Sequence, residues 1–201
     1  MARLSKPLKI ALFGLIGLNA ALILWVAVIS PLMAANAELA LGQGDYRLDV
    51  TDGSEFTAAS LAGRPSAVFF GFTHCPDVCP TTLGDVTGWQ EALGGETELR
   101  VFFVTIDPER DTLDILKDYV GWAPGVTGVT GRVEDVQKVV QSFNIYAEKV
   151  PTDDGDYTMD HSASVLLFDD AGRFVETIRY QEDHDVAVGK IKSLMGIEQA
   201  S

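Results

Sequence analysis

Two nearly continuous apolar runs stand out in the middle of the chain and predict strands buried on both faces. Residues 66–72 read SAVFFGF and residues 99–106 read LRVFFVTI, with too few polar positions for a half-exposed strand. Apolar residues at helical spacing over 81–93 lie between the two runs. A strand, a helix and a second strand in this order predict a right-handed βαβ unit whose two strands are parallel.

The patterns on either side of this unit complete an α/β domain over residues 45–201. Asp52-Gly53, a dipeptide typical of tight turns, separates the extended segments 45–50 and 55–57 and predicts an edge hairpin. Periodicity and turn residues predict helices over 112–120, 134–143 and 186–195, extended segments at 146–150 and 157–159, and a strand hairpin over 164–168 and 174–180. The expected architecture is a central sheet flanked by helices.

A separate apolar segment lies near the N-terminus and predicts one transmembrane helix over residues 10–30. Ile10 to Ile29 contains no charged residue, and twenty residues at about 1.5 Å each span a hydrocarbon core of about 30 Å. Arg3, Lys6 and Lys9 precede it, which places residues 1–9 in the cytoplasm, with a tether over 31–44 and the domain outside. A cleaved signal peptide is the alternative, with a small-x-small site at 35–37, but its apolar core is normally about 7 to 15 residues long.

The net charge of the chain and the predicted location of its domain limit the kinds of partner that it can bind. The chain has a net charge of −14, and all its acidic residues lie from Glu38 onward, where 12 basic residues face 29 acidic ones. A surface this acidic repels phosphate backbones, so nucleic acid is not expected as a partner. The predicted location is a bacterial inner membrane with the domain in the periplasm, in preference to a mitochondrial inner membrane. Cysteines in such an oxidising compartment can form disulfides.

Both cysteines lie in one stretch, GFTHCPDVCPTTL, at residues 71–83, directly after the first buried strand. Pro80 suits the first position of a helix, which would place Cys79 at the N-cap, where free N–H groups and the helix dipole favour a thiolate. Cys75 then lies in the preceding turn. The pair could be a redox-active disulfide, a peroxidatic thiol with its resolving thiol, or a soft-metal site. A purely structural disulfide would close a very small loop and stabilise the fold little.

A cysteine pair between the first core strand and its helix is the arrangement of the thioredoxin superfamily. Thioredoxins have two residues between their cysteines, whereas three lie between Cys75 and Cys79. Cys79-Pro80-Thr81 resembles the peroxidatic Cys-Pro-Thr of peroxiredoxins. That family has Thr or Ser three residues before the cysteine and Pro seven before it, and here those positions are Pro76 and Phe72. The hydroxyl group that activates the peroxidatic cysteine of peroxiredoxins is therefore missing from this chain, which argues against a peroxidase.

His161, immediately before a predicted core strand, favours a metal site. Neighbouring strands bring such a position close to the cysteine turn, so that one imidazole could face two thiolates. His74 should point away from the adjacent Cys75 and His184 opens the last helix, so both are expected to be ordinary histidines. Thiolates suit Cu(I) and imidazole suits copper in either oxidation state. Zinc would accept the same atoms, although a structural zinc site normally has four ligands.

Two carboxylates are candidates to support these ligands. Asp160 precedes His161 and could orient its ring, and Asp77 lies between the two cysteines.

Three stretches together resemble the Sco/SenC family of membrane-anchored copper chaperones for cytochrome c oxidase assembly. They are GFTHCPDVCPTTL at 71–83, VTIDPERDT at 104–112 and YTMDHSASVLLFDDAGR at 157–173, in this order behind the apolar segment. The resemblance implies a thioredoxin-like fold in which Cys75, Cys79 and His161 bind one copper per chain, as Cu(I) and also Cu(II). Relatives often carry an acidic residue where this chain has Thr81-Thr82.

The resemblance also implies partners and a redox state. Copper would go to the dinuclear site of cytochrome c oxidase subunit II or to another copper acceptor, with no catalytic residue involved. Because the two sulfurs are close and the predicted compartment is oxidising, Cys75 and Cys79 are also expected to form a redox disulfide, which a thioredoxin-type reductase would reopen. The alternative function is an extracytoplasmic thiol-disulfide oxidoreductase acting on partner cysteines. A binding module without a transfer role is a third hypothesis.

Overall fold

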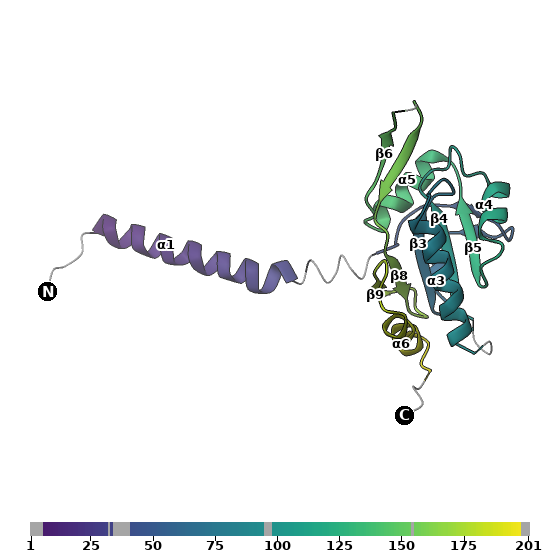
Figure 1. Cartoon of the computed structure of the whole chain (residues 1–201). Coiled ribbons are helices and arrows are strands. Elements are labelled where there is room, and N and C mark those ends of the chain that lie inside the picture. Colours follow the sequence, from purple (N-terminus) through teal and green to yellow (C-terminus); the bar gives the residue numbers. More distant parts are fainter. Residues whose placement is uncertain (1–5, 32, 34–40, 95–97, 154, 198–201) are drawn as a thin grey trace. The chain divides into compact units, whose positions relative to one another are not determined.

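The computed structural model describes residues 6–31, 33, 41–94, 98–153 and 155–197 (Figure 1). The chain divides into two compact units, Met1–Leu39 and Ala40–Ser201. The boundary between them lies within the predicted tether.

The first unit contains the helix α1 (Lys6–Leu24), which continues as a π-helical turn, η1 (Trp25–Ile29). The predicted helix over residues 10–30 is thus present. Within the described part of the chain, however, no helix is both long enough and apolar enough to cross a membrane. The structure therefore confirms the helix but not the membrane span. The small-x-small site at 35–37 lies outside the described residues.

The second unit is built on a seven-stranded sheet in the order β2-β1-β5-β4-β3-β8-β9. Its central strands β3 and β4 are parallel and in register from Ser66–Arg100 to Gly71–Thr105, and β4 is also parallel to β5. The strands β1 and β8 run antiparallel to β5 and β3. The seven strands are β1 (Leu48–Val50), β2 (Glu55–Phe56), β3 (Ser66–Gly71), β4 (Arg100–Thr105), β5 (Val126–Thr130), β8 (Val165–Phe168) and β9 (Phe174–Ile178).

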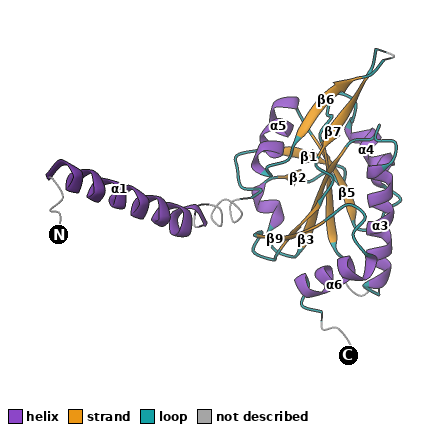
Figure 2. Cartoon of the chain, turned by 60° about the vertical axis from the view of Figure 1, so that its left-hand side comes forward, coloured by secondary structure: helices purple, strands orange, loops and turns teal. Residues whose placement is uncertain are grey.

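Helices cover both faces of this sheet. Figure 2 shows α3 and α4 on one side and α5 on the other, and α6 packs against α3 and the β8–β9 end. The described helices of the unit are η2 (Ala58–Leu61), α3 (Val78–Ala92), α4 (Leu113–Val120), α5 (Val133–Ser142) and α6 (His184–Leu194). The predicted α/β architecture, the βαβ unit and the edge hairpin are all confirmed.

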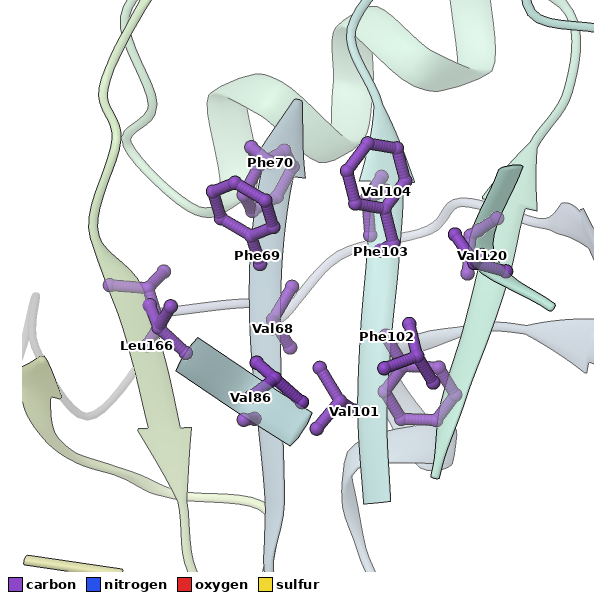
Figure 3. Close-up of a cluster of buried hydrophobic side chains, with 14 of the residues drawn as sticks. Val68, Phe69, Phe70, Val86, Val101, Phe102, Phe103, Val104, Val120 and Leu166 are labelled. Atoms are coloured by element: carbon purple, nitrogen blue, oxygen red, sulfur yellow. The ribbon is translucent and has the colours of Figure 1, made fainter. Parts of the chain in front are cut away.

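The core explains why the two runs are almost entirely apolar. Side chains alternate between the faces of a strand, so a strand covered on both faces buries every residue. On the α5 side, the ring centroids of Phe70 and Phe143 lie 5.2 Å apart. On the α4 side, the ring centroid of Phe103 lies 5.5 Å from that of Phe69 and 5.6 Å from that of Tyr119. Figure 3 shows Phe69, Phe70 and Phe103 within this cluster of β3 and β4 side chains.

One sheet strand, β5, was not predicted from the sequence. Its five residues, VTGVT, are neither a continuous apolar run nor a long alternating one, and they contain Gly128. A Cβ at Gly128 would lie 3.1 Å from the Leu116 side chain and 3.0 Å from that of Thr51. The glycine therefore lets α4 pack closely on the sheet. Because a glycine stands where a strand normally has a larger apolar residue, the sequence pattern of a strand is interrupted at this position.

The strands β6 (Ala147–Pro151) and β7 (Tyr157–His161) form a two-stranded sheet of their own, separate from the seven-stranded one. Both extended segments were predicted. They pair antiparallel, from Ala147 opposite His161 to Pro151 opposite Tyr157. His161 is therefore carried by a hairpin and not by the core sheet.

Candidate metal centre

The cysteine turn connects the end of β3 to the start of α3, at the carboxyl edge of the parallel strands. The helix begins two residues earlier than predicted, with Asp77 at its N-cap and Cys79 inside its first turn, so the placement of Cys79 at the N-cap was wrong. Pro80 is tolerated at the third helical position because the N–H groups of the first turn have no acceptor within the helix. The carbonyl that its ring would meet, four residues back, belongs to Pro76, outside the helix.

Cys75 lies in the turn before the helix and is half-buried. The N–H of Cys79, one of the free donors of the first helical turn, donates to Cys75 Sγ over 3.3 Å. A hydrogen bond with the Cys79 side chain and weaker ones from the backbone N–H groups of Cys79 and Asp77 lower the pKa of the Cys75 thiol to about 4. Cys75 is therefore the thiolate of the pair at neutral pH.

The pKa of Cys79 is shifted in the opposite direction, upwards. Cys79 is completely buried, and both its hydrogen bond to the Cys75 sulfur and its burial raise the pKa of its thiol. Gly71 makes room for this sulfur, because a Cβ at Gly71 would lie only 2.7 Å from Cys79 Sγ and 2.9 Å from the Phe103 ring. The two cysteines therefore have opposite tendencies, since Cys75 favours the thiolate and Cys79 favours the protonated thiol.

His161 faces the same sulfur from the end of β7. Its Nε2 lies 3.9 Å from Cys79 Sγ, and its Nδ1 lies 2.9 Å from the carbonyl oxygen of Ser162. A carbonyl can only accept, so a neutral imidazole holds its proton on Nδ1 and directs the lone pair of Nε2 towards the sulfurs. The Phe72 ring stands edge-on to the imidazole, 5.9 Å away.

The carboxylates expected to support the ligands lie apart from them. Asp160 is exposed, and the ring proton of His161 goes to the Ser162 carbonyl instead. The Asp77 carboxylate is also exposed, and the Thr81 hydroxyl lies 3.4 Å from it. Asp77 touches the site through its backbone N–H, which contributes to the low pKa of Cys75.

The ligand atoms of Cys75, Cys79 and His161 all lie within 4.8 Å of one another. Two donors bonded to one ion at about 2.0 and 2.3 Å lie at most about 4.3 Å apart, so the 3.9 Å between Cys79 Sγ and His161 Nε2 suits a shared ion. Two sulfurs and one imidazole nitrogen form a donor set that suits Cu(I).

The other two histidines lie outside this group. His74 is exposed, with Nδ1 3.1 Å from the Thr73 hydroxyl, and His184 is the first residue of α6. They are suitable controls for His161.

A buried carboxylate that the sequence did not identify supports the turn. Asp111 is completely buried and accepts hydrogen bonds from the Thr73 N–H and hydroxyl, at 3.1 and 2.6 Å, and from the Thr105 hydroxyl, at 2.6 Å. Burial raises the pKa of Asp111, and these hydrogen bonds oppose the shift. Asp111 ties the cysteine turn to the end of β4. Its signal in the sequence is an acidic segment following a buried strand, at the same sheet edge as the cysteines.

Iodoacetamide alkylation of Cys75 is expected to proceed at a constant rate above about pH 5, because the Cys75 thiolate already forms near pH 4. An ordinary thiol would titrate near about 8.5. Removing the Cys79 side chain should raise the pH at which half of Cys75 is ionised, since the hydrogen bond with this side chain is the largest cause of the low pKa of Cys75. The rate of Cys75 modification, followed by mass spectrometry from pH 3 to 9, checks this. A midpoint near 8.5 in the unsubstituted protein would contradict it.

Gly71→Ala is expected to reduce metal affinity at least tenfold, since the new methyl group would overlap Cys79 Sγ and rigid neighbours limit relaxation. Gly84→Ala is the matched control, because a Cβ at this exposed position of α3 meets nothing within 4 Å. Competition titration with a Cu(I) chelator measures the affinity, and chemical denaturation separates it from a loss of stability. Equal affinities in the two variants would show that the sulfur position is not restricted in this way.

Comparison with known proteins finds one family model that matches most of the chain. The family model described as SCO1/SenC matches residues 34–196. The chain is 34% identical over 164 residues to Protein SCO2, mitochondrial, of Saccharomyces cerevisiae, covering 79% of this chain and 54% of that protein. It is 36% identical over 137 residues to the SCO2-like protein of Rickettsia felis, covering 66% and 67%. The chain therefore spans about half the length of the mitochondrial relatives that it matches.

Among solved structures, Bradyrhizobium japonicum ScoI with copper bound resembles the chain with a TM-score of 0.70 and 40% sequence identity. The match covers 77% of this chain and 99% of ScoI. The similarity thus extends over the whole copper-bound relative and agrees with the thioredoxin-like fold implied by the sequence.

Proposed function

The chain belongs to the SCO1/SenC family, and on that premise we propose that it is a copper chaperone that holds one copper ion through Cys75, Cys79 and His161. The observation that carries the proposal is the convergence of these three side chains from two distant parts of the sequence, with their donor atoms within 4.8 Å. The copper-bound state of the Bradyrhizobium relative supports the choice of metal.

The donor set favours Cu(I) as the principal cargo. Cys75 already supplies a thiolate, and Cys79 can supply a second by losing its proton as the metal binds. The imidazole of His161 would also serve Cu(II). Three ligands leave a position open to an incoming ligand of an acceptor.

The exposure of the three ligands suggests the order of release. Cys79 is completely buried, whereas Cys75 and His161 are half-buried and lie nearer to solvent. An acceptor ligand would reach the ion from the side of Cys75 and His161 and replace them before Cys79. The acceptor that the family resemblance favours is the dinuclear copper site of cytochrome c oxidase subunit II.

The same dithiol supports a second candidate function, thiol-disulfide exchange with partner cysteines. The observation that favours it is the low pKa of the half-buried Cys75, because a thiolate beside a second thiol can attack a disulfide and then be resolved. This activity would make the protein a reductant of its partner instead of, or before, a copper donor.

The test combines copper transfer with a disulfide reductase assay. The purified protein is reduced, loaded anaerobically with Cu(I), and mixed with the metal-free soluble domain of subunit II. The chaperone proposal expects one copper per chain, its movement to the acceptor, and negligible turnover in insulin reduction. Rapid insulin reduction without copper binding would favour the oxidoreductase, and copper binding without transfer would leave a storage or sensing module.

We also propose that residues 45–201 act outside the cytoplasm, on the argument from the basic residues ahead of the apolar segment. A reporter enzyme that is active only in the periplasm, fused after Ser201, is expected to be active. An inactive reporter in a stable fusion would refute the location.

A further inference from the structure

The hairpin β6–β7 contacts the hydrophobic core through few of its side chains. No residue of either strand is fully buried, and every residue of β6 after Ala147 is exposed. Ala147 and Met159 are its side chains that pack against the hydrophobic core. His161 is the last residue of β7, so the contacts that hold this hairpin against the rest of the unit also affect the position of His161.

Polar contacts supply that attachment at the far end of β7. The Tyr157 hydroxyl donates to Asp107 Oδ1 over 2.8 Å, and Arg110 Nη1 donates to the Tyr157 carbonyl oxygen over 3.0 Å. Arg110 Nε donates to Asp107 Oδ2 over 2.5 Å. The Arg110 guanidinium also lies 3.8 Å from the centroid of the Tyr157 ring. Both ends of the Tyr157 residue, hydroxyl and carbonyl, are therefore held by the segment that follows β4.

The hydrogen bonds to Asp107 are expected to be strong. Asp107 is completely buried, so its carboxylate makes charge-assisted hydrogen bonds away from competing water. An outer ion pair between Lys149 of β6 and Glu109 joins the same two segments, but both its side chains are about half exposed, so it should contribute little.

The segment after β4 supports both halves of the metal site. Asp107 holds the hairpin through Tyr157, and Asp111 holds the cysteine turn through Thr73. The two aspartates are joined by the hydrogen bond from the Asp111 N–H to the Asp107 carbonyl oxygen, at 2.9 Å. One turn of backbone thus contacts both the hairpin that carries His161 and the turn that carries Cys75.

We propose that Tyr157, Arg110 and Asp107 form a positioning latch that holds the β6–β7 hairpin where His161 Nε2 faces the two cysteine sulfurs. The inference deepens the proposed function, since it concerns how the third copper ligand is held. Tyr157 and His161 lie on the same face of β7, four residues and about 13 Å apart, and five consecutive residue pairs join β7 to β6. Fixing Tyr157 therefore restricts His161 through a paired strand.

The first experiment uses the metal-free protein. Tyr157→Phe removes the hydroxyl and keeps the ring, and Tyr146→Phe is the matched control, because the Tyr146 hydroxyl donates to Glu148 within the hairpin and not to the Asp107 segment. The readout is the NMR shift of the His161 ring protons, which sense the Phe72 ring 5.9 Å away. With Tyr157→Phe these shifts should move towards free-histidine values and broaden, and with Tyr146→Phe they should not. Unchanged shifts in Tyr157→Phe would overturn the latch.

The second experiment measures Cu(I) affinity in two backgrounds. Tyr157→Phe is expected to reduce affinity about tenfold, or about 1.4 kcal/mol, when His161 is present, and to have no effect when His161→Ala has removed the ligand being positioned. Arg110→Lys, which keeps the charge beside Asp107 but loses the planar fork, should behave in the same way. An equal loss in both backgrounds, or from Tyr146→Phe, would overturn the proposal.

The two experiments separate the latch from the proposed function. If the unsubstituted protein binds no copper, the copper proposal fails, and the NMR comparison still decides whether Tyr157 positions His161.

Discussion

Replacing either cysteine by alanine is expected to reduce Cu(I) affinity by more than about 100-fold while leaving the unit folded. Loss of a residue that merely supports a ligand costs about 10 to 100-fold, and loss of a thiolate ligand should exceed that range. Cys75→Ala removes the sulfur that is ionised before metal binds. Cys79→Ala removes the buried sulfur and, with it, the side-chain hydrogen bond to Cys75, while the backbone N–H donor remains.

His161→Ala should reduce affinity by about 100-fold, less than either cysteine, because Cu(I) prefers thiolate to imidazole. His74→Ala and His184→Ala are the matched controls, one beside the cysteine turn and one at the start of α6, and neither should change the affinity. Anaerobic competition with a Cu(I) chelator of known affinity measures all five variants. Full affinity in His161→Ala would refute the three-ligand site.

These variants also bear on which parts of the site could be predicted from sequence. The cysteines and His161 could be identified because each has a chemistry that few roles explain, and because the cysteines follow one predicted core strand and His161 precedes another. Their convergence follows from the antiparallel pairing of β3 with β8, because it places the start of β8, just after His161, beside the end of β3, just before the cysteines. The hairpin that carries His161 was predicted as two extended segments, although its separation from the main sheet was not.

The supporting residues could not be assigned in the same way. Asp107 and Asp111 appear in the sequence as acidic residues after a strand, and such residues are usually solvated. Their burial becomes evident only when their donors, Tyr157 and Thr73, are brought in from 50 and 38 residues away. The start of α3 was misplaced for a local reason, since a proline is acceptable at any of the first positions of a helix whose N–H groups lack partners.

Oxidation of Cys75 and Cys79 to a disulfide is expected to reduce Cu(I) affinity by more than about 100-fold, because one bond between the sulfurs removes both thiolate ligands. The structure holds the two cysteines in the reduced form with their sulfurs within 4.8 Å, and a disulfide requires about 2.05 Å. Cys75 lies half-buried in a turn, whereas Cys79 is fixed in the first turn of α3, so Cys75 should make most of this movement. In an oxidising compartment a thioredoxin-type reductase would then be needed to restore binding, which is part of the proposed function.

Reduction should restore one copper per chain, and the proton balance gives an independent check. With the pKa of Cys75 near 4 and that of Cys79 raised, the reduced site at pH 7 holds one thiolate and one thiol. Binding Cu(I) to both sulfurs should therefore release about one proton per copper, where two ordinary thiols would release about two. Isothermal titration calorimetry in two buffers of different ionisation enthalpy measures this number, beside a count of free thiols before and after reduction. Equal affinity in the oxidised and reduced forms would mean that the sulfurs are not the ligands, and two protons per copper would mean that the Cys75 thiolate does not exist in the metal-free protein.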